Sequence, residues 1–187
     1  MKKKIILILF IVLVGLLIYS DIKKTRVDNS KPKNDTVAQN IFDGKNSTFI
    51  INGENVTLKN GASETEVAPG SASKIITRYF GNESYGDLNG DGLQDEAFLV
   101  TQETGGSGIF YYAVVALKTA NGYKTTNAFF IGDRIAPQTT EINTSAKELY
   151  VNFAERKPGE PMTAQPSQGA TLYLKVTPAG VLEGLMN

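Results

Sequence analysis

The sequence predicts an all-β fold, a single small sandwich or partly open barrel, preceded by an N-terminal transmembrane helix. Three observations support this prediction. After residue 45, β-branched and aromatic residues alternate with polar ones, and turn signals recur at intervals of about 8–12 residues. No stretch of this region carries an apolar stripe over three helical turns. Before residue 20, by contrast, the chain has a basic start and a continuous apolar run.

The N-terminal segment combines three lysines at 2–4 with the uncharged run IILILFIVLVGLLIY at 5–19. Such a segment is typical of an uncleaved transmembrane anchor or of a signal peptide. A helix of this length rises about 22 Å, against a hydrocarbon core of about 30 Å, and flanking lysines can reach the interface. Because the only candidate cleavage site, at 18–20, is poor, we expect a single-pass anchor with residues 1–4 in the cytoplasm.

Residues 20–45 are polar and predict a flexible linker. The first 45 residues carry nine Lys or Arg and four Asp or Glu, whereas residues 46–187 carry ten and fifteen. The acidic balance of the second part argues against a nucleic-acid partner. We therefore expect residues 46–187 to form an extracytoplasmic β domain that the N-terminal helix holds at the cell membrane.

Within the domain, residues 48–51 and 55–58 flank a turn at Gly53-Glu54 and are expected to pair as a hairpin. Six further segments have the alternating or continuous apolar pattern of strands: 74–80, 96–102, 110–117, 123–131, 148–154 and 171–177. Gly-rich or Pro-rich breaks separate them at 105–108, 134–138 and 157–169. The segment 71–80 also fits a short helix with its apolar residues on one face, and this helix is the alternative there.

The chain contains no Cys, no His and no Trp. Ser-His-Asp and Cys-His catalysis, His-ligated zinc, Fe–S clusters and disulfides are therefore excluded. Carboxylates, hydroxyls, Lys, Arg and oxygen-ligated metals remain as sources of chemistry. No complete catalytic constellation appears among them, and we expect a protein that is not an enzyme.

The most specific motif is D-L-N-G-D-G-L-Q-D at residues 87–95. Calcium takes six to eight oxygen ligands, and alternate residues of a tight loop bring their oxygens to one centre. A glycine at the sixth position, residue 92, permits the sharp reversal of the backbone. The predicted ligands of one structural Ca²⁺ are Asp87, Asn89, Asp91, the carbonyl of Leu93, and Asp95. The ion would hold together carboxylates that otherwise repel one another.

This loop resembles the calcium loops of FG-GAP/VCBS (integrin-α-like) repeats and of dockerins. An EF-hand would have a bidentate Glu at the twelfth position, where this chain has Phe98, whereas the FG-GAP form closes with an Asp at the ninth, as Asp95 does. The motif occurs once, so a multi-bladed propeller is not expected. In a wider resemblance, the order GDLNGDG, TGGSGIFYY, IGDRIAP and PGEPMTAQPS is similar to a domain of uncharacterised bacterial envelope proteins. It implies an envelope location and no particular activity.

We therefore expect a binding or scaffolding role in the cell envelope, with an envelope protein or a glycan as partner. A carboxylate-based hydrolase of cell-wall glycan is one alternative and would need two convergent acids, for instance Glu155 with Asp133 or Glu103. An accessory or inhibitor protein of an envelope enzyme is another. Asp133 and Arg134 are expected to pair with each other, the alternative being that Arg134 binds a ligand carboxylate.

Overall fold

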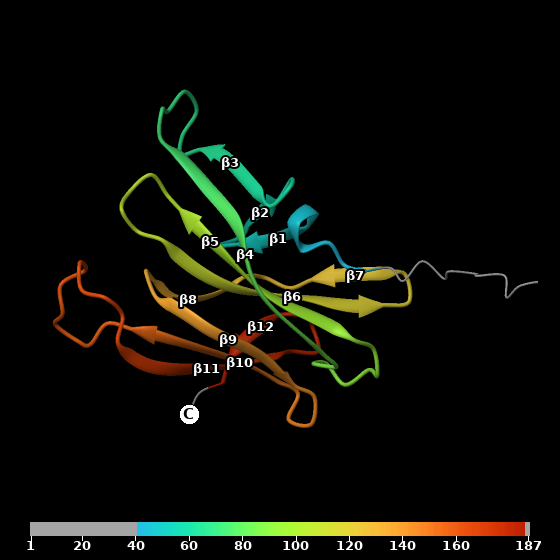
Figure 1. Ribbon diagram of the computed structural model, residues 1–187. Coiled ribbons are helices and arrows are strands. Elements are labelled where there is room, and N and C mark those ends of the chain that lie inside the picture. The colour runs from blue at the N-terminus through green and yellow to red at the C-terminus, as the bar shows by residue number, and fades with distance from the viewer. Residues whose placement is uncertain (1–40, 186–187) are drawn as a thin grey trace, which may run out of the picture. The chain divides into compact units, whose positions relative to one another are not determined.

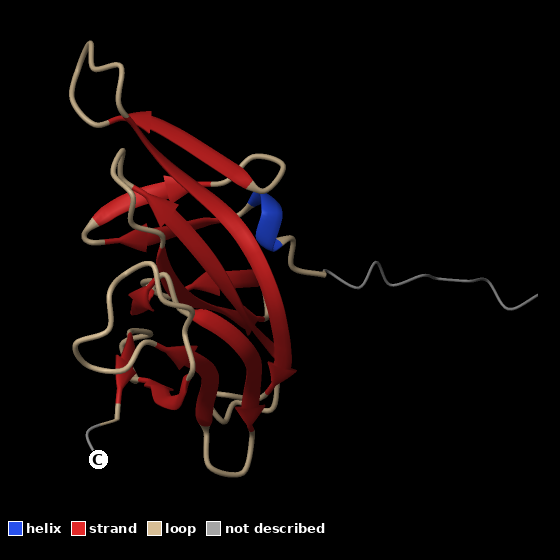
Figure 2. Cartoon of the chain, turned by 60° about the vertical axis from the view of Figure 1, so that its left-hand side comes forward, coloured by secondary structure: helices blue, strands red, loops and turns tan. Residues whose placement is uncertain are grey.

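The computed structural model describes residues 41–185, and within this range the chain is all-β apart from one short 3-10 turn (Figure 1, Figure 2). This confirms the all-β part of the predicted fold class. The predicted cytoplasmic end at 1–4, the anchor at 5–19 and residues 20–40 of the linker lie outside the described residues. Residues 41–185 contain no helix that is long and apolar enough to cross a membrane.

The described elements form a six-stranded, a four-stranded and a two-stranded sheet. They are, in chain order, the 3-10 turn η1 (Gly44–Asn46) and the strands β1 (Thr48–Ile51), β2 (Glu54–Thr57), β3 (Ala62–Glu66), β4 (Lys74–Gly86), β5 (Asp95–Glu103), β6 (Phe110–Thr119), β7 (Gly122–Thr125), β8 (Phe129–Asp133), β9 (Ala136–Asn143), β10 (Glu148–Glu155), β11 (Gln168–Val176) and β12 (Leu182–Gly184).

The six-stranded sheet has the order β3-β4-β5-β6-β7, and β8 also pairs with β6. Its centre is the antiparallel pair β5 and β6, which runs in register from Glu96 opposite Ala116 to Gln102 opposite Phe110. The four-stranded sheet, β12-β11-β10-β9, packs against one face of this pair and lies below it in Figure 1. The buried side chains between the two sheets form the larger core: Leu88, Ala97, Leu99, Ala113, Val115, Leu117, Ile135, Ile142, Leu149, Val151, Phe153, Leu174 and Leu182.

The hairpin of β1 and β2 covers the opposite face of the same central pair. There Phe49 and Ile51 of the hairpin meet Phe98, Val100 and Val114 in a second core. Both faces of β5 and β6 are therefore buried, which explains why their sequences read as continuous apolar runs rather than as an alternation. The predicted hairpin at 48–58 is confirmed, with Asn52 and Gly53 at the turn in positive φ.

The alternative of a helix over residues 71–80 is wrong. Residues 67–73 form a connection, and β4 begins at Lys74 and extends to Gly86. Its apolar residues suited a helix face, but β4 lies between β3 and β5 and forms ladders with both. Pairing on two sides satisfies the backbone of this segment as a strand.

The segment 123–131, predicted as one strand, is divided into β7 and β8. Between them Asn127 exchanges hydrogen bonds with the backbone of Leu182 in β12, at 2.8 and 3.1 Å, and the Ala128 N–H donates to the Ile50 carbonyl at 2.7 Å. The interruption thus ties β8 to the other two sheets. At the start of the described range, Phe42 packs on Phe98 with ring centroids 5.8 Å apart, so the last residues of the predicted linker belong to the folded unit.

Candidate metal centre

The loop of residues 87–95 connects β4 to β5 beside the β9–β10 turn, at the lower right of Figure 1. Leu88 points into the larger core and is 1% exposed. The Asp87 N–H donates to the Thr144 hydroxyl at 3.2 Å, and a Cβ at Gly86 would lie 2.8 Å from Ile142. The loop is therefore fixed against the second sheet through its backbone and through the buried side chain of Leu88.

Asp87 organises the first half of the loop. Its Oδ1 accepts the N–H groups of Gly90 and Asp91 at 2.6 and 3.1 Å, and its Oδ2 accepts that of Gly92 at 2.9 Å. Gly90 and Gly92 both have φ of +82°, a conformation that a Cβ would disfavour. The backbone consequently curls around the Asp87 carboxylate.

Asn89 and Asp91 stand on the exposed side of the loop. The Asn89 Oδ1 accepts the Asp91 N–H at 2.9 Å, and its Nδ2 donates to the Asp91 Oδ2 at 3.0 Å. The Asp91 Oδ1 accepts the Leu93 N–H at 2.8 Å. These bonds hold the three polar side chains of positions one, three and five in fixed orientations. Both residues also line a pocket of about 380 Å³ beside the turn at 177–180.

Asp95 lies beneath the loop and is fully buried. Its two oxygens accept the N–H groups of Leu88, at 3.0 Å, and of Lys118 on β6, at 2.9 Å. Burial raises the pKa of this carboxyl, while the two N–H groups act in the opposite direction. The sequence pattern assigned Asp95 to the metal, and the structure gives its carboxylate a further role as the fastening of the loop.

The donor set suits a hard cation but is not a closed cage. In the described part of the chain, no three acidic side chains come close enough together to share a metal ion. Each carboxylate has about four lone-pair directions, so Asp87 and Asp91 keep acceptor capacity beyond their internal hydrogen bonds. The Lys147 ammonium lies against Gly90, where an added Cβ would collide with it. A cation at this loop would therefore compete with a neighbouring positive charge.

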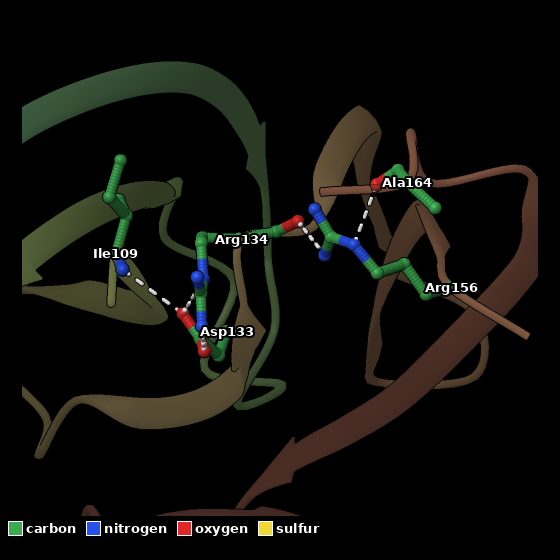
Figure 3. Close-up of polar contacts among 5 residues, drawn as sticks. All are labelled: Ile109, Asp133, Arg134, Arg156 and Ala164. Carbon is green, nitrogen blue, oxygen red and sulfur yellow. Dashed lines mark hydrogen bonds and ion pairs between the residues drawn. The ribbon is translucent and has the colours of Figure 1, made fainter. Parts of the chain in front are cut away.

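Asp133 and Arg134 pair with each other (Figure 3). Asp133 also accepts the Ile109 N–H at 3.0 Å, and these donors hold its pKa below the usual range. The carbonyl of Arg134, whose φ is +49°, accepts from Arg156, which also donates to the Ala164 carbonyl at 2.7 Å. This network joins the loops 104–109, 132–136 and 156–167 at one end of the domain.

The acids named for glycan hydrolysis have separate environments. The lowered pKa of Asp133 does not suit a general acid, although an ionised carboxylate suits the second role in such a pair. Glu103 forms an ion pair with Arg78 at 2.6 Å, and Glu155 is exposed at the end of β10.

One buried acid was not found from the sequence. Glu96 on β5 is 6% exposed, and burial together with the nearby charges of Glu83 and Asp43 raises its pKa to about 7. Beside it, the Tyr79 hydroxyl donates to Glu83 at 2.6 Å, and burial together with this hydrogen bond raises the pKa of the tyrosine. The segment containing Phe42 and Asp43 packs over this part of the sheet. The burial of Glu96 therefore depends on tertiary structure and could not be predicted from the local sequence.

Comparison with known proteins gives no relative for this chain. No protein-family model, no curated protein and no solved structure matches it.

Proposed function

We propose that the chain is a membrane-anchored protein of the bacterial cell envelope with a binding or scaffolding role. Its β domain lies outside the cytoplasmic membrane and binds one Ca²⁺ at the loop of residues 87–95. Residues 5–19 serve as the single-pass anchor, and the polar segment that follows separates the domain from the bilayer. The partner is an envelope protein or a glycan.

The arrangement of Asp87, Asn89 and Asp91 carries the calcium proposal. Their side-chain oxygens belong to one tight turn, and backbone N–H groups orient them before any ion binds. Oxygens from alternate residues of a tight loop suit Ca²⁺, with the Leu93 carbonyl as a further proposed ligand. Asp95 stays in the proposed set, but the described structure does not bring its carboxylate close enough to those of Asp87 and Asp91 to share one ion, so its coordination would need the loop to rearrange when the ion binds.

The ion would serve structure rather than catalysis. It would offset the repulsion among the acidic side chains and hold the exposed half of the loop beside the pocket lined by Asn89 and Asp91. The environments of Asp133, Glu103 and Glu155 give the glycan-hydrolase alternative no support.

A thermal melt of the full chain in detergent tests the metal proposal. Ca²⁺ added to a chelated sample at a hundred times its Kd stabilises the folded state by about 2.7 kcal/mol, which raises Tm by about 5–10 °C. Asp87→Ala and Asp91→Ala should abolish the rise. Glu141→Ala, on β9 and outside the loop, is the matched control and should keep it. If adding Ca²⁺ to the chelated wild-type protein leaves its Tm unchanged, the proposal is contradicted.

Cell fractionation tests the location. The full chain should remain with membranes through alkaline carbonate extraction, and protease added to spheroplasts should remove the domain. Extraction of the chain into the soluble fraction, or protection of the domain until the membrane is lysed, would contradict the anchored, outward arrangement.

A further inference from the structure

Strands β2 and β3 begin to pair and then separate. Asn60 and Gly61 form the turn between them, with φ of +52° and +86°. Lys59 and Ala62 exchange two backbone hydrogen bonds, at 2.8 and 3.2 Å. This is the start of a hairpin with a two-residue loop. Within residues 41–185, however, β2 goes on to pair only with β1, and β3 only with β4.

Continued pairing would place Thr57 opposite Glu64 and Asn55 opposite Glu66, and neither pair forms. The backbone groups of these four residues point away from the partners that the strands already have. Residues 61 and 67, at either end of β3, bond to Tyr79 and Ser73. Because hydrogen-bonded positions alternate along an antiparallel strand, the odd-numbered residues face β4 and the backbone groups of Glu64 and Glu66 face outward. On β2 the Leu58 N–H donates to the Ser47 carbonyl. Residues 54, 56 and 58 therefore face β1, and the backbone groups of residues 55 and 57 face outward. Two short stretches of open strand edge therefore diverge from one turn.

A pocket of about 380 Å³ lies between the two edges. Its sides are residues 54–56 of β2 and residues 65–67 at the end of β3, and its floor includes Ile51, Ile75 and Gln102. Val67 on its rim is 48% exposed. Among the described residues, the site thus combines backbone donors and acceptors that have no partner with apolar surface for side chains.

The rim of this groove is acidic. Glu54 stands on one side and Glu66 on the other. Glu66 accepts the Gly70 N–H at 2.8 Å, and among the described residues neither carboxylate has a Lys or Arg within ion-pair distance. Acidic residues on strand edges disfavour pairing with a second copy of the same edge, since Glu64 and Glu66 would face their own counterparts.

We propose that the groove between β2 and β3 binds an extended, basic peptide segment of a partner protein by strand addition. The backbone of the peptide pairs with the open edge of β3, alternate side chains rest on the floor, and Lys or Arg side chains face Glu54 and Glu66. The inference deepens the binding role proposed above and is independent of the calcium loop, because no residue is shared between the two sites.

Synthetic peptides and the full chain in detergent provide the test. The probe is a fluorescent seven-residue peptide of alternating Lys and Val, and its binding is followed by anisotropy. One control is the same peptide with Glu in place of Lys. Two further controls are Lys-Val peptides with every second backbone nitrogen methylated, the odd-numbered nitrogens in one peptide and the even-numbered nitrogens in the other. We expect binding of the unmodified basic peptide, at least tenfold weaker binding of one methylated form, and no binding of the acidic one.

Variants locate the site. Glu66→Pro removes the outward N–H of β3 without removing a bond to β4, whereas Glu66→Gln removes the same charge and keeps the N–H. Glu66→Gln and Glu54→Gln should weaken binding about threefold each, and Glu66→Pro at least tenfold. Glu141→Gln on β9 should leave binding unchanged, and thermal melts identify any variant that fails to fold.

Four results would overturn the proposal. The first two are no binding of the basic peptide, and equal binding of the unmodified peptide and both methylated forms. The third is equal binding by the Glu66→Pro and Glu66→Gln variants. The fourth is binding that appears only when Lys31→Ser and Lys33→Ser are introduced together. The last would make the chain's own linker the occupant. The calcium-dependent rise in Tm, measured on the same samples, separates these outcomes from failure of the metal proposal.

Discussion

The carboxylate of Asp95 accepts the backbone N–H of Leu88 at 3.0 Å, so the last residue of the acidic loop holds its second residue in place. Its other oxygen accepts the N–H of Lys118 on β6. The loop is thereby fastened to the central strands from below, while its remaining acidic side chains stay at the surface. Asp95 thus fixes the buried side of the loop through its two backbone contacts.

Replacing Asp95 should destabilise the domain even without calcium. Asp95→Ala leaves the buried N–H of Leu88 and the partly buried N–H of Lys118 without acceptors, and we expect the free energy of unfolding to fall by about 2–4 kcal/mol. Urea unfolding in chelator measures this. Asp91→Ala, whose bonds are exposed, should cost less than about 1 kcal/mol under the same conditions. Equal losses in the two variants would contradict the fastening role.

Leu88 should contribute to stability through burial. Leu88→Ala removes a side chain that is 1% exposed and opens a cavity in the larger core, at a cost of about 2–5 kcal/mol. Leu93→Ala, in the same loop but 38% exposed, is the matched control and should change stability by less than about 1 kcal/mol. Denaturant midpoints of the two variants compare them directly, and a similar shift in both would show that Leu88 does not anchor the loop.

Lys147 should oppose calcium binding. Its ammonium lies against Gly90, and removing one nearby positive charge from a partly solvated site is worth about 1 kcal/mol. Lys147→Gln should therefore tighten Ca²⁺ binding about fivefold in a calorimetric titration at low salt, with a smaller gain at high salt. Lys59→Gln, outside the loop, should leave the Kd unchanged. Weaker binding by the Lys147 variant would contradict this prediction.

Glu96 should make stability depend on pH. Its pKa of about 7 in the folded domain exceeds the ordinary glutamate value of 4.5, so the folded state favours the protonated acid. Its contribution is fully present below about pH 4.5 and is lost as the pH rises through about 7, a difference of up to about 3 kcal/mol. Glu96→Gln should remove this loss and be the more stable protein at pH 8. Urea unfolding of both proteins at pH 5 and pH 8 measures the difference.

Glu83→Gln serves as the companion variant, because it removes one of the charges that raise the pKa of Glu96. The loss of stability between pH 5 and pH 8 should then be smaller and complete at a lower pH. If wild type and Glu96→Gln show the same change between pH 5 and pH 8, Glu96 does not titrate as described.

The central strands could be predicted because each of their sequences contains a continuous apolar run. Runs such as Phe98–Val100 and Tyr112–Leu117 are apolar on both faces, since one core lies on each side of them. Strand β3, with the sequence ASETE, carries no large apolar residue, and in β9 only Ile142 is buried. These two strands exist through backbone pairing with β4 and β10, which no local pattern reports.

The acidic loop was likewise visible, because its spacing sets Asp87, Asn89 and Asp91 on one turn. The second role of Asp95 was not, since it depends on the Lys118 N–H from a strand 23 residues further on. The groove between β2 and β3 was also hidden, because the same residues would satisfy an ordinary continuous hairpin.

Equilibrium dialysis of the chelator-treated full chain against Ca²⁺ most directly tests the central claim. The account predicts one Ca²⁺ bound per chain at saturation, and the same value in the presence of excess Mg²⁺. The Asp87→Ala variant should bind none. No bound calcium in the wild-type protein, or one ion that persists after Asp87→Ala, would contradict it.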